Sequence, residues 1–380
     1  MRETAGLMTV IKGNFRPDIL LVYEEVAWQL RRNGWDSDEY LPSSYFIRQG
    51  KSSRIALLGS ILRAMSARRV WAALRDWKFF FEDSRPRIGR MLDFFSFSRY
   101  LDSHAADAVF ILNQRHSAGA CYAARLRGIP IVTHQHGDYY NNQVLLTRPM
   151  RDIEGPDTIR IVWNEESRKL IEEFAPRGSF RIAGSLKHAN IQRKAHGTRF
   201  EPGFVFFETI FPDAAKDRRV AEFSAKVLGS LQRQLAYPVY VALHPSRGNA
   251  KRGSLPEDAL QQYAEQEVRS WPHPRDHVEW AICSDSNALL DLVASGTPCL
   301  HLKREDSYLA IPSAYPGTIE AYGDIVAQVR QAITSSDRTT LAEAQLAFLQ
   351  QNKMGSPATV DQSFTELLSE LEAGKVMQTS

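Results

Sequence analysis

The chain has 380 residues, of which 43% are hydrophobic and 24% are charged, as in an ordinary globular protein. This length favours two domains. The formal net charge of +3 is too small to indicate a nucleic-acid partner. The sequence holds no run of about eighteen apolar residues, so we expect no membrane-spanning helix.

Three cysteines, Cys121, Cys283 and Cys299, all lie in apolar helix or strand patterns. A sparse and odd set of this kind is typical of reduced core thiols and predicts a cytoplasmic protein. The spacing of these cysteines fits no zinc site. The first residues lack an apolar core followed by a small-residue cleavage site, so we expect no signal peptide.

Residues 1–47 contain one weak strand–helix pattern, with its helical part at 18–30. The region 48–99 contains twelve basic and four acidic residues, and tryptophans such as Trp71 recur in it at helical spacing. A basic amphipathic helix with tryptophans can lie on an anionic membrane surface. An ordinary domain helix with a solvated basic face, or a patch that receives an anionic acceptor, fits the same pattern.

From residue 108 onward, short apolar strands alternate with helices, which predicts parallel sheets covered on both faces. The predicted strands are 109–112, 131–133, 159–163, 180–183, 204–207, 238–243, 278–283 and 299–302. The predicted helices are 117–127, 165–174, 217–235, 288–294, 322–333, 339–349 and 360–371. The fold class is therefore α/β, with two Rossmann-like domains facing across a cleft.

The domain boundaries follow from a polar, basic stretch that begins near residue 187 and lacks apolar periodicity. It predicts an interdomain linker at 191–203. The N-terminal Rossmann-like domain is then 1–190, and the C-terminal Rossmann-like domain is 204–340. Helices in 341–380 are expected to pack back toward the N-terminal domain.

The stretch 277–302 holds a strand, a hydroxyl-rich turn, a helix and a second strand. The turn contains Ser284, Ser286 and Asn287. The N-terminus of such a helix offers backbone N–H groups and positive dipole potential to an anion, with hydroxyl groups as further donors. Alternatively, the serines only cap the helix.

Polar residues follow many of the predicted strands, where ligands of open α/β sheets bind. They are His134 and His136, Asn164, Gly184 with Ser185, Glu208, His244 and Ser284. A single histidine at such a place can be structural. Six such positions together predict a binding site.

His244 and Pro245 stand at a strand end, one β–α connection before Ser284, so both His244 and Ser284 can reach one phosphate. Arg247 and Arg252 in the adjoining loop can add positive charge. No acidic pair stands at a strand end to hold Mg²⁺, so we predict a metal-independent reaction. Neither a P-loop nor a GxGxxG pattern occurs, which argues against an ATPase or an ordinary dehydrogenase.

His136 is the predicted general base that deprotonates a hydroxyl group, because histidine titrates near neutral pH. Gly137 beside it permits close approach of a substrate to the backbone. Asp138 can orient His136 or act as the base itself. His134 is expected to be structural.

Four motifs together resemble a known family: IVTHQHG (131–137), RIAGS (181–185), VALHP (241–245) and SDSNALLDLVASGTP (284–298). They look like those of bacterial surface-polysaccharide glycosyltransferases of the GT-B type that carry a His-Pro motif and a serine motif. This group includes polysialyltransferase-like and Kdo-transferase-like enzymes and is related to CDP-glycerol glycerophosphotransferases. The resemblance covers roughly residues 105–335.

The resemblance implies that His244, Ser284 and Ser286 contact the donor's phosphates and that His136 is catalytic. We place Pro245, Arg247, Asn287 and Glu208 in the same nucleotide site. The chain departs from the sialyltransferase pattern, since 153–155 only partly matches its acidic triplet. It also has Cys-Ser-Asp-Ser at 283–286 in place of Asp-Tyr-Ser-Ser, so the donor stays open.

The predicted function is an inverting-type glycosyltransferase that moves a sugar from a nucleotide donor to a bacterial surface polysaccharide or capsule acceptor. A CMP-sugar is favoured and a UDP-sugar is the alternative. We expect no cofactor, because the nucleotide-sugar is a co-substrate. The acceptor is a glycan or a lipid-linked glycan, with peripheral contact at the inner face of the plasma membrane through 48–99. The alternatives are a polyol-phosphate transferase with a CDP-linked donor, a nucleotide-sugar epimerase, and a non-catalytic protein that binds glycan or lipid intermediate.

Overall fold

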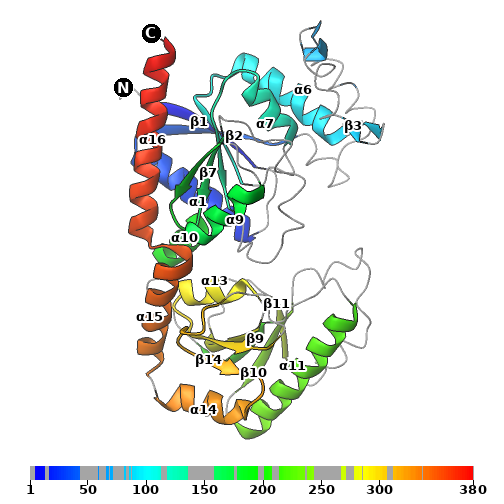
Figure 1. Cartoon of the computed structure of the whole chain (residues 1–380), viewed down its shortest axis with the longest axis vertical. Helices are drawn as coiled ribbons and strands as arrows, with labels where there is room; N and C mark the ends of the chain where they lie inside the picture. Colours follow the sequence, from blue (N-terminus) through cyan, green and yellow to red (C-terminus); the bar gives the residue numbers. More distant parts are fainter. Residues whose placement is uncertain are drawn as a thin grey trace. The chain divides into compact units, whose positions relative to one another are not determined.

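The computed structural model describes most of the chain in two compact units (Figure 1). The described residues are 5–12, 17–42, 59, 66–67, 69–71, 81–82, 85–86, 88–112, 118–135, 158–174, 178–195, 201–207, 214–235, 238–243, 267–270, 278–284, 286–305, 311–335 and 337–379. One unit comprises Met1–Asn190 with Gly355–Ser380, and the other comprises Ile191–Met354.

The first unit contains a six-stranded parallel sheet with the order β2-β1-β5-β6-β7-β8. Its strands are β1 (Gly6–Ile11), β2 (Trp35–Tyr40), β5 (Ala108–Ile111), β6 (Ile131–His134), β7 (Thr158–Val162) and β8 (Ser179–Ile182). Its helices are α1 (Pro17–Arg32), α6 (Ile88–Ser103), α7 (Ala118–Arg125), α9 (Glu165–Phe174), α10 (Leu186–Lys194) and α16 (Pro357–Thr379). A two-stranded hairpin, β3 (Phe81–Glu82) with β4 (Arg85–Pro86), precedes α6.

Helices cover both faces of this sheet. Apolar side chains of α1, α10 and α16 pack on one face, where Val26 and Phe364 are fully buried. Helices α6 and α7 pack on the other face, with Phe94 and Cys121 in the core. Helix α16 comes from the end of the chain, so the first unit combines Met1–Asn190 with residues that follow the whole second unit in sequence (Figure 1).

The second unit contains a parallel sheet with the order β11-β10-β9-β12-β13-β14. Its strands are β9 (Glu201–Phe207), β10 (Val239–Leu243), β11 (Glu267–Ser270), β12 (Val278–Cys283), β13 (Cys299–Lys303) and β14 (Thr318–Glu320). Its helices are α11 (Ala214–Gln234), α13 (Ala288–Ala294), α14 (Ile325–Ser335), α15 (Arg338–Leu349) and the short π-helix η2 (Gln350–Met354). Side chains of α11 and α14 fill the core on one face of the sheet.

Much of this architecture matches the sequence prediction. The fold class is confirmed, because each unit holds one parallel sheet of Rossmann type. Strand β12 and helix α13 have the predicted limits. Asn164 caps α9, since its side-chain oxygen accepts a hydrogen bond from Ser167 N at 2.8 Å.

The two units divide at Asn190, the predicted end of the N-terminal domain. The segment 191–203, expected to be the linker, includes the end of α10 at Lys194 and the start of β9 at Glu201. Helix α15, expected to return toward the N-terminal domain, belongs to the second unit. Gln345 of α15 is fully buried and bonds both Cys299 N and Cys299 O, which attaches this helix to β13. Only the chain from Gly355 onward joins the first unit.

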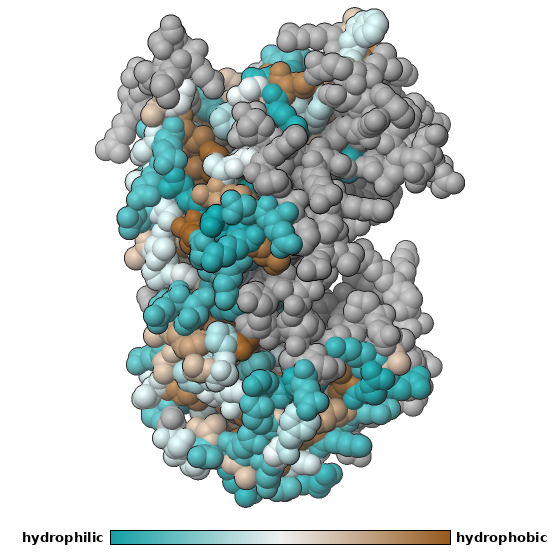
Figure 2. Space-filling view, in the orientation of Figure 1, coloured by the Kyte–Doolittle hydropathy of each residue, from teal (hydrophilic) through white to brown (hydrophobic). Residues whose placement is uncertain are grey.

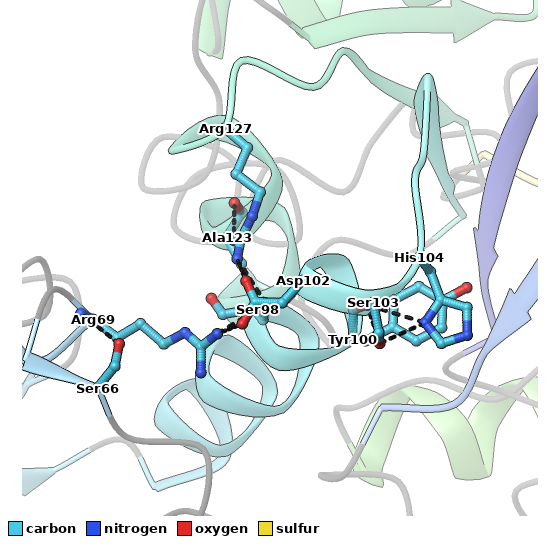
Figure 3. A network of polar contacts seen from close by, with 9 residues as sticks. All are labelled: Ser66, Arg69, Ser98, Tyr100, Asp102, Ser103, His104, Ala123 and Arg127. Carbon is cyan, nitrogen blue, oxygen red and sulfur yellow. Dashed lines mark hydrogen bonds and ion pairs between the residues drawn. The ribbon is translucent and has the colours of Figure 1, made fainter.

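The region 48–99 is described only in part. Over 88–99 it forms an ordinary domain helix, because Phe94, Phe95 and Phe97 of α6 are buried. At the end of α6, Arg69 and Arg127 point from different sides toward the same acceptors, Ser98 O and Asp102 (Figure 3). Among the described residues, no helix is long and apolar enough to cross a membrane.

A first prediction concerns the contact between α6 and α7. A Cβ added at Gly119 would lie 2.0 Å from Arg90 O and 2.7 Å from Phe94 N, which are backbone atoms that cannot yield locally. We expect Gly119→Ala to lower the free energy of unfolding by about 2 to 3 kcal/mol. Chemical denaturation of the purified variant measures this change.

The matched control is Gly229→Ala in α11. There the nearest atoms to an added Cβ belong to the flexible Arg233 side chain, at 3.4 Å. This change should raise stability by up to about 1 kcal/mol, because alanine favours the helix. Equal stabilities of the two variants would contradict the tight α6–α7 contact.

Candidate functional site

The carboxyl edge of the second sheet contains a point where the chain connections change direction. From β9 the chain proceeds through α11 to β10 on one side, whereas β12 leads through α13 to β13 on the other side. In open α/β sheets, ligands bind in the crevice at such a switch point. Cys283 at the end of β12 is paired with Phe207 at the end of β9, so Ser284 stands at the switch point.

The three described residues of the predicted phosphate loop do different things. Ser284 is buried, with 2% of its surface exposed, whereas Ser286 is half-buried and Asn287 is exposed. The Ser286 hydroxyl accepts a hydrogen bond from Ala288 N, the first amide of α13, at 3.2 Å. The next amides, Leu289 N and Leu290 N, bond to Ser286 O and Asn287 O. The first turn of α13 therefore uses these amides itself, which corrects the expectation that they are free for an anion.

Arg304 supplies a positive charge at this edge. It follows β13 directly, only 9% of its surface is exposed, and its Nη1 donates to the Ser284 hydroxyl at 3.5 Å. A guanidinium group in so little solvent interacts strongly with an anion, because few water molecules screen it. Arg304 is not among the residues predicted from the sequence, although an arginine directly after a buried strand was the available signal.

Below this edge the core is rigid and chemically inert. Cys283 and Cys299 are buried free thiols, as predicted. Burial, together with the neighbouring Cys283 thiol, raises the pKa of Cys299 well above its ordinary value, so Cys299 stays protonated. The Tyr315 hydroxyl donates to Cys299 O at 2.9 Å, and the Gln345 side chain bonds the same residue. Side-chain hydrogen bonds therefore hold the start of β13, the strand that precedes Arg304.

At the carboxyl edge of the first sheet, polar residues mainly stabilise helix starts. His134 is buried, and its Nε2 accepts a hydrogen bond from Leu186 N, the first amide of α10, at 3.3 Å. Ser185 Oγ accepts from His188 N at 3.4 Å. His134 thus has the structural role expected of it, and its Nε2 acts as an acceptor.

Gln135 holds the chain as it leaves β6. Its side-chain oxygen accepts from Trp163 N at 3.0 Å, and its Nε2 donates to the Ser167 hydroxyl at 3.1 Å. The ring of Trp163 meets the ring of His188 edge-on, with 5.2 Å between centroids. The residue that precedes His136 is therefore fixed to both β7 and α9.

Several predicted site residues lie outside the described part of the chain. They are His136, Asp138, Glu208, His244, Pro245 and Arg247. Within the described ranges, no group of three or more His, Cys, Asp or Glu side chains could hold a metal ion. The described site therefore consists of Ser284, Ser286, Asn287 and Arg304.

No model of a known protein family matches the chain, and no curated protein sequence matches it. Solved structures do resemble it. A Listeria monocytogenes protein described as a UDP-N-acetylglucosamine 2-epimerase is 8% identical, with a TM-score of 0.61 and 98% of each chain covered. Anabaena HepE, solved in complex with UDP and glucose, is 9% identical, with a TM-score of 0.55, covering 96% of this chain and 100% of its own.

The UDP-forming α,α-trehalose-phosphate synthase of Burkholderia vietnamiensis is 12% identical, with a TM-score of 0.50, covering 96% of this chain and 99% of its own. Identities this low show the fold alone. The similarity to these structures and the two Rossmann-type sheets establish that the chain has the GT-B fold of glycosyltransferases and nucleotide-sugar epimerases. The narrower resemblance to polysialyltransferase-like and Kdo-transferase-like enzymes stays a prediction.

A second prediction tests the anion site. Arg304→Gln, His244→Ala, or Ser284→Ala combined with Ser286→Ala should each weaken nucleotide binding by roughly 1.5 to 3 kcal/mol, the scale of a hydrogen bond to a charged group. Calorimetric titration with UDP, CDP and CMP measures the effect and ranks the nucleotides.

Arg338→Gln is the matched control, because this arginine bonds Gly296 O after the C-terminal end of α13, at the opposite edge of the sheet. It should bind nucleotide like the unaltered protein. Undiminished affinity in Arg304→Gln would show that the phosphate does not bind at Arg304.

Proposed function

We propose that the chain is a metal-independent glycosyltransferase that moves a sugar from a nucleotide-activated donor to a bacterial surface polysaccharide. The observation that carries this proposal is the buried Arg304 beside Ser284 at the switch point of a Rossmann-type sheet. A cation and hydroxyl groups in this crevice suit a diphosphate. The GT-B fold is the second support, because it is shared with proteins solved with UDP.

We place the donor on the second unit, with its phosphates at Ser284, Ser286, Asn287 and Arg304. His244, Pro245, Arg247 and Glu208 complete this site in the proposal. A UDP-sugar is our first choice of donor, because the resembling structures are solved with UDP or have UDP or a UDP-sugar in their names. The CMP-sugar favoured by the sequence motifs is the alternative.

In the proposed reaction, His136 removes the proton from the acceptor hydroxyl while the oxygen of that hydroxyl attacks the anomeric carbon of the donor sugar. The bond to the donor phosphate breaks on the opposite face, so the anomeric configuration inverts. Arg304 and His244 offset the negative charge that develops on the leaving phosphate, the task that a metal performs elsewhere. Asp138 orients His136 or replaces it as the base.

We propose that the acceptor is a glycan or a lipid-linked glycan, and that 48–99 contacts the inner face of the plasma membrane. Trp71 supports this contact, because 72% of its surface is exposed. Arg69, two residues before Trp71, and Arg127 both form ion pairs with Asp102. Elsewhere, the described surface visible in Figure 2 is mainly hydrophilic, with small separate apolar areas.

A nucleotide-sugar epimerase is the second candidate, favoured by the similarity to a protein described as a 2-epimerase. The polyol-phosphate transferase and the non-catalytic glycan-binding protein remain the further alternatives. Product analysis separates these candidates. An epimerase alters a UDP-sugar without any acceptor, and a polyol-phosphate transferase releases CMP from a CDP-linked donor.

A third prediction concerns the base. His136→Ala should reduce turnover at least about a hundredfold, because a positioned base contributes roughly a hundred- to ten-thousand-fold. Nucleotide affinity should hardly change, since the base contacts the acceptor. Turnover is measured as nucleotide release in the presence of acceptor. If Asp138→Asn loses turnover and His136→Ala keeps most of it, the carboxylate is the base.

A fourth prediction concerns the membrane. Trp71→Ala should weaken co-sedimentation with vesicles containing phosphatidylglycerol by about tenfold, because the indole ring no longer enters the interface. Leu41→Ala, at another exposed apolar residue, is the control and should sediment like the unaltered protein. Equal binding to vesicles of phosphatidylcholine alone would contradict an anionic surface as the partner.

A further inference from the structure

Tyr322 is an exposed aromatic residue whose orientation is fixed. It follows β14 closely, and 67% of its surface is exposed. Its hydroxyl oxygen accepts a hydrogen bond from Glu305 N at 3.0 Å. Single exposed apolar residues are normal on protein surfaces. A large exposed ring that is held at its polar end is different, because stacking on it costs little further conformational entropy.

Tyr322 lies next to the proposed phosphate site. Strands β12, β13 and β14 are consecutive neighbours in the sheet, spaced about 4.8 Å apart. Arg304 bonds Ser284 after β12, and the next residue, Glu305, bonds Tyr322 after β14. Two consecutive residues therefore connect the phosphate site to the aromatic ring along the carboxyl edge.

The direction of this connection matters. The switch-point crevice lies between β9 and β12, whereas Tyr322 lies on the far side of Arg304, beyond β13. A nucleotide-sugar has its nucleoside on one side of the phosphates and its sugar on the other. With the phosphates at Ser284 and Arg304 and the nucleoside on the β9 side of them, the sugar extends toward β14.

We propose that Tyr322 and Glu305 form the subsite for the pyranose ring of the donor. The aromatic face stacks on the C–H groups of the sugar, and the exposed Glu305 carboxylate accepts hydrogen bonds from its hydroxyl groups. This inference rests on the proposed function, because it takes Arg304 as the phosphate contact. It assigns sugar recognition to residues that the motifs do not contain.

Two other roles for Tyr322, stacking on the nucleobase and connecting two segments, predict binding results that differ from those of a sugar subsite. If the ring stacked on the nucleobase, its removal would weaken UDP and UDP-sugar binding equally. If the Tyr322 hydroxyl only connected the segments after β13 and β14, then Tyr322→Phe would weaken binding of the sugar nucleotides as much as Tyr322→Ala. The ring and the tether can thus be separated by two substitutions.

The experiment compares UDP, UDP-glucose and UDP-N-acetylglucosamine by calorimetric titration of the full chain. For the unaltered protein we expect tighter binding of at least one sugar nucleotide than of UDP. In Tyr322→Ala this advantage should fall by about tenfold, which corresponds to about 1.4 kcal/mol. Affinity for UDP should change less than about twofold. Tyr322→Phe keeps the ring and should retain most of the advantage, whereas Glu305→Gln should lose part of it.

The outcomes that overturn the proposal are distinct. An unchanged sugar advantage in Tyr322→Ala, no sugar advantage in the unaltered protein, or an equal loss for UDP would each overturn the sugar subsite alone. Failure of the unaltered protein to bind any of CMP, CDP and UDP would instead overturn the proposed function. Melting temperatures of both Tyr322 variants, measured without ligand, show whether an effect on binding arises from unfolding.

Discussion

The reversal of chain direction between β9 and β12 is the constraint on which the proposed site depends. Because the connections from these two strands run to opposite sides, their carboxyl ends mark the place where ligands of open α/β sheets bind. The pairing of Cys283 with Phe207 places Ser284 at this point. The neighbouring strand β13 then delivers Arg304 to the same edge. Strand order therefore determines which side chains can meet a ligand.

Burial gives Arg304 its importance. A guanidinium group with little exposure has lost much of its hydration, so its interaction with an anion is screened less than at the surface. The support beneath it is dry and well bonded, since Tyr315 and Gln345 both bond to the backbone of Cys299. The backbone of β13 that precedes Arg304 is therefore held in place by side-chain hydrogen bonds.

The two sheets use the polar residues at their carboxyl edges differently. In the first unit, His134, Asn164 and Ser185 accept hydrogen bonds from the first amides of α10 and α9, so their polar atoms serve local structure. In the second unit, the Ser286 hydroxyl accepts from the first amide of α13, whereas the Ser284 hydroxyl accepts from the buried Arg304. A polar residue after a strand is thus a weaker sign of function than a polar residue beside a buried charge.

The sequence by itself determined the α/β alternation, the parallel sheets and the limits of β12 and α13, because these follow from local apolar periodicity and cap residues. It missed β2, whose interior side chains are mostly polar and exposed, because pairing with β1 stabilises this edge strand. It named Ser284 but neither Arg304 nor Tyr322. Those residues lie at the same edge as Ser284 only because β12, β13 and β14 are adjacent, and adjacency of strands is decided by tertiary packing. The return of α16 to the first unit depends on the same long-range packing, since its partner α1 lies more than three hundred residues earlier.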